Sequence, residues 1–297
     1  MSRLLPHLLA ALALTATATT TTAQPRPLVG LNHFYLVPDS ATFAAIDASP
    51  FLRDTLGIFE ARTTRRADQT YTGVYWYGTT HYFEFLPPGA GGRKPGESGL
   101  AWGSDDPADA TPLFNALSRI PGDVVDTVMI TRGIDSTQVP WFLQTRMRSA
   151  ATRSDVVTWV MHYASDFLTR WNGALPPAGA ATSRTAVLER YAARVNAHAR
   201  RGSVPFADIE RLVFAVGDGT RAQLLAECRA MGLSGKEASP CVGADGVVVE
   251  LVSATNGRRG LQAITMRLRR AWDGPAERRF GRSRLRLVSP ERAVWQF

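Results

Sequence analysis

The chain has 297 residues, of which 45% are hydrophobic and 20% are charged. This is the composition of a globular protein with room for two or three small modules, and it excludes disorder of the whole chain. The formal net charge of +8 does not indicate a nucleic-acid-binding protein, because the positive residues are nearly all arginines scattered along the chain.

The first 23 residues have the pattern of a cleaved signal peptide. Arg3 precedes an apolar run from Leu4 to Leu14, and small residues follow up to Ala23. A transmembrane anchor is the alternative, but the run is about half of the roughly 20 residues that a spanning helix needs. We therefore predict a signal peptide at residues 1–23, a secreted or periplasmic location, and no membrane insertion of the mature chain.

Residues 28–88 have the pattern of a βαβββ module. An apolar run is followed by a helix that begins at Asp39-Ser40, and then by three runs rich in aromatic and β-branched residues. The predicted strands are 28–37, 59–66, 71–77 and 81–86. Glycine and proline crowd residues 87–99, which indicates a loop or a module boundary.

Two further units are predicted. Residues 98–170 have a less regular order of one strand, one helix and three strands, and residues 207–297 begin with a run that matches 34–39 in type and order. Apolar residues three and four apart predict a connecting helix at 185–201. The expected fold is therefore α+β, with repeated βαβββ modules, mixed curved sheets and flanking helices.

Three segments of the first module resemble the glyoxalase-like, vicinal-oxygen-chelate superfamily, and more narrowly an uncharacterised bacterial family of secreted glyoxalase-like proteins. They are residues 31–39 (LNHFYLVPD), 75–78 (YWYG) and 82–85 (YFEF). The resemblance implies a divalent metal ion (Zn, Fe, Mn or Ni) held by a His of a first strand and a Glu of a last strand. Those positions are His33 and Glu84.

The partner module must supply the remaining metal ligands, and here the sequence departs from the superfamily pattern. The third unit has Leu212 and Arg286 at the matching positions, whereas the second unit places His162 about where Glu84 lies in the first. The predicted metal site is therefore His33, Glu84 and His162. A set of two His and one carboxylate leaves coordination positions open for a substrate.

Two functions from different classes follow from the resemblance. The first is a metal-dependent lyase, isomerase or dioxygenase that acts on a small oxygen-rich molecule, with Glu84 and Tyr82 as candidate groups that move protons. The second is a metal-free protein that binds or sequesters a small molecule. Both predict a small-molecule ligand and no nucleic acid, and neither determines the oligomeric state.

Both candidate metal ligands of the first module, His33 and Glu84, also have simpler explanations. His33 could bond backbone atoms in a turn. Glu84 interrupts an aromatic strand, and a buried carboxylate is costly unless it is paired or coordinated. An ion pair with Arg62, Arg65 or Arg66 would satisfy Glu84 without a metal.

Cys228 and Cys241 are the only cysteines, and an even count in an exported protein predicts one disulfide between them. Two unrelated buried thiols are the alternative. His81 alternates away from Glu84 and is expected at the surface. The chain has no Gly-x-Ser-x-Gly, His-Glu-x-x-His or Walker motif, which does not favour serine hydrolysis or a nucleotide cofactor.

Overall fold

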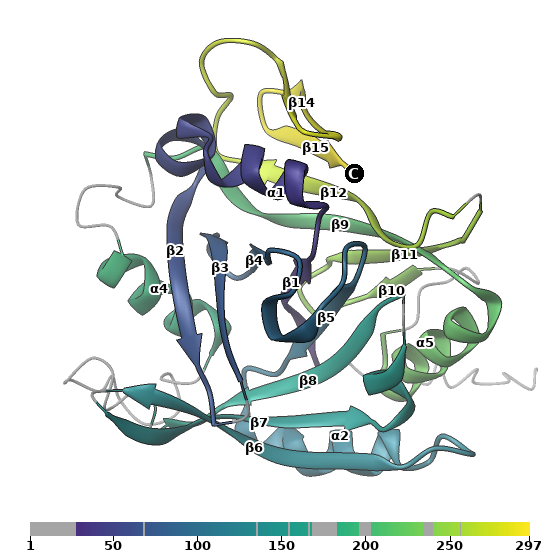
Figure 1. The fold of residues 1–297 in the computed structure, drawn as a ribbon. Helices are drawn as coiled ribbons and strands as arrows, with labels where there is room; N and C mark the ends of the chain where they lie inside the picture. The colour runs from purple at the N-terminus through teal and green to yellow at the C-terminus, as the bar shows by residue number, and fades with distance from the viewer. Residues whose placement is uncertain are drawn as a thin grey trace, which may run out of the picture.

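The computed structural model describes residues 28–67, 69–134, 136–153, 155–165, 167, 183–195, 203–233, 240–255 and 257–297. The predicted signal peptide and the last part of the predicted 185–201 helix lie outside these ranges. The described residues form two mixed curved sheets with a few helices, an α+β architecture (Figure 1). In these ranges no helix is both long enough and apolar enough to span a membrane.

The first sheet contains eight strands within the described residues. They are β1 (Gly30–Leu36), β2 (Ile58–Arg65), β3 (Thr70–Tyr77), β4 (Tyr82–Phe85), β5 (Ser98–Gly103), β6 (Val125–Ile134), β7 (Thr137–Met147) and β8 (Val157–Tyr163). Their order is β2-β3-β4-β1-β5-β8-β7-β6. β1 is parallel to β4, β5 is parallel to β8, and β1 and β5 pair antiparallel at the centre. β1 is buried along its whole length, as expected for a strand covered on both faces.

The first sheet curves into a half-barrel (Figure 1). Its two ends approach each other, because Arg66, next to β2, forms an isolated antiparallel bridge with Arg132 of β6. Helix α4 (Arg184–Val195) lies beside β2, and its buried side chains share an apolar cluster with side chains of β2, β3 and β4. Its Tyr191 stacks on Tyr77 with ring centroids 5.4 Å apart, and the Tyr191 hydroxyl accepts a hydrogen bond from Arg132 at 2.7 Å.

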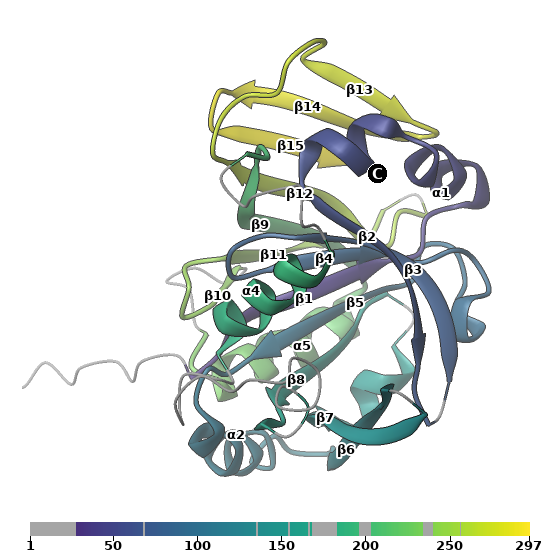
Figure 2. The same ribbon diagram turned by 90° about the vertical axis from the view of Figure 1, so that its left-hand side faces the viewer.

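The second sheet contains seven strands within the described residues. They are β9 (Phe206–Val216), β10 (Pro240–Val242), β11 (Val248–Ser253), β12 (Gly260–Leu268), β13 (Glu277–Phe280), β14 (Ser283–Ser289) and β15 (Arg292–Gln296). Their order is β10-β11-β9-β12-β15-β14-β13, with β9 parallel to β11. The last three strands form an antiparallel meander, which Figure 2 shows at the top of the molecule.

Within the described residues, three further α-helices and four short turns connect these strands. The α-helices are α1 (Ser40–Asp47), α2 (Ala110–Leu117) and α5 (Asp218–Ala230), and the turns are a π-helix at Phe51–Leu56 and 3₁₀ turns at Ala90–Gly92, Pro107–Asp109 and Ser149–Thr152. Asp39 caps α1, since its carboxylate accepts a hydrogen bond from the backbone N–H of Thr42 at 2.9 Å. The predicted disulfide is confirmed: Cys228 near the end of α5 is bonded to Cys241 of β10.

The two sheets share one apolar core. Trp295 of β15 packs edge-to-face on Phe85 of β4, with ring centroids 5.0 Å apart, and Phe206 of β9 packs on Phe83 of β4 at 5.3 Å. These side chains belong to a continuous cluster that also includes residues of α1, α2 and α5. The convex face of the first sheet is therefore buried, and its concave face is the one that carries a cavity.

Candidate functional site

Strand alternation places the candidate residues of the first module on the concave face. His33 and Tyr35 alternate on β1, and Tyr82 and Glu84 alternate on β4. The parallel register sets His33 beside Tyr82 and Tyr35 beside Glu84. The sequence-predicted residues of the first module are thus brought together on two central strands.

Small residues on β5 leave space in front of this group. Ala101 is the β5 partner of His33, and Gly99 is the partner of Tyr35. A side chain at Gly99 would collide with the ring of Tyr35, which lies over the glycine. The next strand, β8, presents Trp159 beside Ala101 and Val157 beside Gly99. Small residues flanked by large ones hollow the centre of the sheet.

The hollow is a cavity of about 330 Å³, within the range of small-molecule sites. It is lined by aromatic, arginine and a few other polar side chains. They include Tyr35, Tyr71, Tyr82, Trp141, Phe142 and Trp159, the arginines Arg62, Arg66, Arg93 and Arg146, and His33, Glu84, Glu97, Gln69 and Gln144.

His33 is a neutral imidazole at the floor of the cavity. Its Nδ1 donates a hydrogen bond to Oδ1 of Asn32 at 2.9 Å, and its ring stacks on Tyr82 with centroids 4.3 Å apart. Burial, together with the positive charge of Arg62, lowers the pKa of His33 to about 3. With Nδ1 protonated, Nε2 is left as an acceptor, and it lies 3.7 Å from Oε1 of Glu84.

Glu84 is buried, with 6% of its surface exposed. Burial raises the pKa of its carboxyl group, and the charges of Arg62, Arg93 and Arg66 and the hydroxyl of Tyr75 offset only part of that effect. Among the described residues, no arginine lies within ion-pair distance of Glu84. The alternative of an ion pair with Arg62, Arg65 or Arg66 is therefore not formed. Nearby arginines instead act on Glu84 through their positive charge, without direct contact.

Arg62 has its own partners on the same face. Its Nη1 donates hydrogen bonds to the Tyr77 hydroxyl at 2.8 Å and to Glu60 at 3.0 Å. Its guanidinium lies 4.0 Å from the centre of the Tyr75 ring, a cation–π arrangement. Arg62 is therefore held in place by the surrounding wall, where it contributes a fixed positive charge.

Tyr82, the predicted proton-moving tyrosine, forms part of the floor. Burial raises the pKa of its hydroxyl well above the ordinary value, with smaller contributions from Tyr163 and Glu84. Tyr82 therefore keeps its proton at neutral pH, so its hydroxyl can donate a hydrogen bond to a ligand. Its role in proton transfer stays a prediction.

His162 lies on the other face of β8. Trp159 and Met161 line the cavity, and alternation directs His162 away from it. Both ring nitrogens of His162 are buried without a hydrogen-bond partner among the described residues. Burial lowers its pKa, against the charge of Asp109. His162 is thus not brought to His33 and Glu84.

The donors present do not fit the predicted metal ion. In the described part of the chain, no three His, Cys, Asp or Glu residues are grouped so that they could hold one. On the neighbouring strands, β5 places Gly99 and Ala101 beside Tyr35 and His33, and β8 presents Trp159 and Met161 to the cavity. None of these four residues is a ligand for Zn, Fe, Mn or Ni in the expected set. His33 and Glu84 remain as two isolated donors in a wall rich in arginine.

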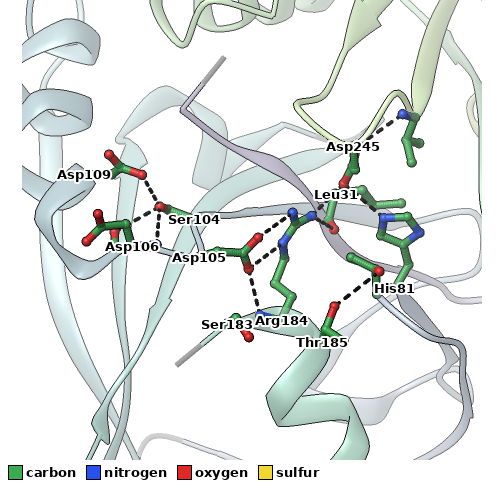
Figure 3. Close-up of polar contacts among 12 residues, drawn as sticks. Leu31, His81, Ser104, Asp105, Asp106, Asp109, Ser183, Arg184, Thr185 and Asp245 are labelled. Carbon is green, nitrogen blue, oxygen red and sulfur yellow. Dashed lines mark hydrogen bonds and ion pairs between the residues drawn. The ribbon is translucent and has the colours of Figure 1, made fainter. Parts of the chain in front are cut away.

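A second polar cluster joins the two sheets and α4, and sequence analysis missed it (Figure 3). His81, expected at the surface, is buried and lies between two carboxylates, 3.0 Å from Asp245 and 3.2 Å from Asp208. Arg184 at the start of α4 bridges Asp245 at 2.6 Å and Asp105 at 3.0 Å. In the sequence, His81 is only a histidine next to a turn. That pattern does not identify partners that lie more than 100 residues away, such as Asp208 and Asp245.

The charges of this second cluster are matched, unlike those of the cavity. Arg184 also donates to the backbone carbonyl of Leu31 at 2.6 Å. Asp208 accepts hydrogen bonds from the backbone N–H groups of Thr80 and His81 at 2.9 Å. These ion pairs and hydrogen bonds stabilise the contact between elements, whereas the arginine-lined cavity offers groups to a ligand.

The fold and the cavity define an α+β protein with a ligand-sized hollow on the concave face of a curved mixed sheet. Within that class, the chain belongs to a family of unknown function, DUF5829, whose model matches residues 31–297. No curated protein matches the chain. A crystal structure of a hypothetical protein from Staphylococcus aureus is similar, with 9% identity and a TM-score of 0.45 over 76% of this chain and 86% of that one.

Proposed function

We propose that this chain is an exported protein of glyoxalase-like fold that binds a small organic molecule in the concave cavity without a metal ion. The observation that carries the proposal is the cavity itself, whose wall combines aromatic rings, arginines and a neutral imidazole. Ligand sites are typically concave and mostly apolar, with a few placed polar groups. The positions that would complete a metal site carry Gly99, Ala101, Trp159 and Met161 instead.

The strand order supports the glyoxalase-like part of the proposal. The order β2-β3-β4-β1 on one side mirrors β6-β7-β8-β5 on the other, and in each half the first strand is parallel to the last. One helix follows the first strand of each half, α1 and α2. Two βαβββ modules paired through β1 and β5 account for this symmetry. The second sheet does not repeat it, because β12 is antiparallel to β15.

Export is supported by the leader pattern at residues 1–23 and by the disulfide between Cys228 and Cys241. Disulfides persist in oxidising compartments such as the periplasm or the extracellular medium and are rare in the cytosol. A protein in these compartments can bind a molecule before it enters the cytoplasm.

The test uses residues 24–297, purified from the periplasm without a chelator. Metal content is measured by mass spectrometry, and a library of small neutral, anionic and cationic molecules is then screened by thermal shift in EDTA. Gly99→Val is the test variant, because its side chain would push the Tyr35 ring into the cavity. Gly219→Val is the matched control, because Gly219 faces open space on α5.

We expect ligands that raise the melting temperature in EDTA, that lose this effect in Gly99→Val and keep it in Gly219→Val. Near-stoichiometric metal that His33→Ala and Glu84→Gln both remove would contradict the proposal and restore the metal-enzyme hypothesis. A library without any ligand sensitive to Gly99→Val would also contradict it.

A further inference from the structure

We infer that the ligand of the cavity is an aromatic carboxylate whose acidic group is bound by Arg146. The inference rests on the proposed function and names its ligand class. Four arginines line the cavity, against two glutamates, Glu84 and Glu97. Since His33 has a lowered pKa and is neutral, the wall has an excess of positive charge.

Arg146 of β7 differs from two of the other arginines in having no hydrogen-bond or ion-pair partner among the described residues. Arg62 bonds Glu60 and Tyr77, and Arg93 donates to Gln69 at 3.3 Å and to the carbonyl of Ala90 at 3.1 Å. Among the described residues, Arg146 forms no hydrogen bond and no ion pair within 4.0 Å, and its Nε is buried without an acceptor. A buried donor without an acceptor costs about 1–3 kcal/mol, and more when it is charged.

Arg146 lines the same cavity as the aromatic floor. Gln144 and Arg146 alternate on β7, and Gln144 pairs with Met161 of β8. A planar guanidinium matches a carboxylate, because two parallel N–H groups can donate to its two oxygens. An acidic group of the ligand would therefore satisfy the donor that the protein leaves unpaired.

Aromatic rings surround the space that the body of the ligand would occupy. Tyr82, His33 and Trp159 form a row across the floor, with His33 edge-to-face on Trp159 at 5.4 Å between ring centroids. Trp141 and Phe142 of β7 add a second wall. A flat ring can pack on such surfaces by offset stacking or edge contacts, which favours an aromatic over a saturated ligand.

A free inorganic anion fits these observations less well than an organic acid. Phosphate would satisfy Arg146 but would leave the aromatic rings around a 330 Å³ cavity without a partner. A neutral aromatic compound would cover the rings but leave the guanidinium unpaired. A molecule with both an acidic group and an aromatic ring would satisfy Arg146 and also cover the aromatic side chains of the wall.

The experiment is isothermal titration calorimetry of the mature chain in EDTA with matched probes. Benzoate and 2-naphthoate are compared with benzamide and 2-naphthamide, which have the same rings without the charge, and with cyclohexanecarboxylate and inorganic phosphate. Arg146→Gln removes the proposed anion receptor. Arg148→Gln is the control, because Arg148 lies two residues away, is exposed and is paired with Asp126 at 3.1 Å.

We expect at least one acid to bind about tenfold or more tightly than its amide. Arg146→Gln should lower the affinity for that acid by about 10- to 100-fold, the range of a charge-assisted hydrogen bond, and leave the affinity for the amide unchanged. Arg148→Gln should leave both unchanged, and cyclohexanecarboxylate and phosphate should bind more weakly.

Amides that bind as tightly as the acids, or acids that bind Arg146→Gln unchanged, would overturn the ligand class while the cavity remains a binding site. Absence of binding by all six probes would overturn the ligand class as well. The proposed function would fail with it only if the library screen also yields no ligand that Gly99→Val displaces.

Discussion

Glu84 and His33 illustrate how burial, acting on single residues, sets the chemistry of the cavity. Burial makes the charged form of each group less favourable, so the pKa of Glu84 is raised and the pKa of His33 falls to about 3. The carboxyl group therefore binds its proton more tightly than in the unfolded chain, while the imidazole stays neutral. Both groups can exchange hydrogen bonds with a ligand at low cost.

The raised pKa of Glu84 predicts that its charge destabilises the fold. A carboxyl whose folded pKa is above its ordinary value of 4.5 stabilises the protein in acid, and that stability is lost as the pH rises through the folded pKa. Glu84→Gln, which cannot ionise, should therefore melt at a higher temperature than the wild type at pH 7. The difference in melting temperature between the two proteins should decrease towards pH 4.

Thermal denaturation of both proteins between pH 4 and pH 8 checks this prediction. Glu250→Gln is a suitable control, since Glu250 is ion-paired with Arg211 on the exposed side of β11. A Glu84→Gln protein that is less stable than the wild type at pH 7 would show that the arginine field outweighs burial.

Among the elements, β5 decides that the first sheet has a cavity. Gly99 and Ala101 are the β5 neighbours of Tyr35 and His33, and larger side chains there would fill the concave face. Helix α4 packs against the first sheet, where Tyr191 stacks on Tyr77 of β3. The cavity is lined by side chains of the strands on both sides of β5, namely β1 to β4 and β7 and β8.

The link between α5 and β10 gives a prediction for stability. Cys228 and Cys241 are 13 residues apart, and a cross-link around a loop of about 15 residues stabilises a protein by about 3 kcal/mol in the chain-entropy model. We expect the double variant Cys228→Ala, Cys241→Ala to lose about 2–4 kcal/mol of the free energy of unfolding, measured with urea.

Dithiothreitol should lower the wild-type stability to a similar extent and should not affect the variant. A wild-type midpoint that does not respond to the reductant under unfolding conditions would contradict a stabilising role of this bond.

At the scale of the whole molecule, the two sheets depend on each other for burial. Trp295 of β15 is fully buried and packs on Phe85 of β4 and on Phe280 at the end of β13. Removing a large aromatic side chain from such a core costs about 3–5 kcal/mol. Trp295→Ala should therefore lower the free energy of unfolding by that amount, in urea denaturation followed by circular dichroism. A loss below about 1 kcal/mol would indicate that the sheets are stable separately.

The polar cluster in Figure 3 gives the contact between the sheets a pH dependence. Burial alone would lower the pKa of His81, but hydrogen bonds and charges of Asp208 and Asp245 raise it overall. The other charges that face this group are Arg184 of α4 and Arg267, which pairs with Asp208 at 3.3 Å. A raised folded pKa stabilises the protein fully below the ordinary value of 6.5 and loses that contribution as the pH rises through the folded pKa.

His81→Gln should therefore lower the free energy of unfolding most at pH 5.5, by about 3–5 kcal/mol as for a broken buried ion pair, and less at pH 9. His162→Gln is a control of opposite sign, because burial lowers the pKa of His162 and its neutral form is stabilising at high pH. Urea denaturation of the three proteins at both pH values measures the difference. An equal cost of His81→Gln at both pH values would contradict a charged His81.

Local sequence patterns predicted most elements of the fold. The period-two pattern with aromatic and β-branched residues predicted the strands of the first sheet to within a few residues, and Asp39 marked the start of α1. The strands β10, β13 and β15 are short or rich in arginine and alanine, so a period-two pattern does not identify them. Their pairing partners supply the stability that their own propensity lacks. The module boundaries at 28–88, 98–170 and 207–297 stay predictions.

The sequence by itself determined which side chains of the first module share a face, because strand alternation is a local property. The even cysteine count predicted the disulfide, whereas His33 and Glu84 were paired as candidate ligands through the resemblance to the glyoxalase-like superfamily. Only the tertiary structure decided that His162 faces away, that His81 is buried between Asp208 and Asp245, and that Arg146 lines the cavity without a partner in the described part of the chain. These facts depend on strand register and on contacts between strands that are distant in sequence. A register shift of one residue would move each side chain to the other face of the sheet, and no local pattern encodes the register.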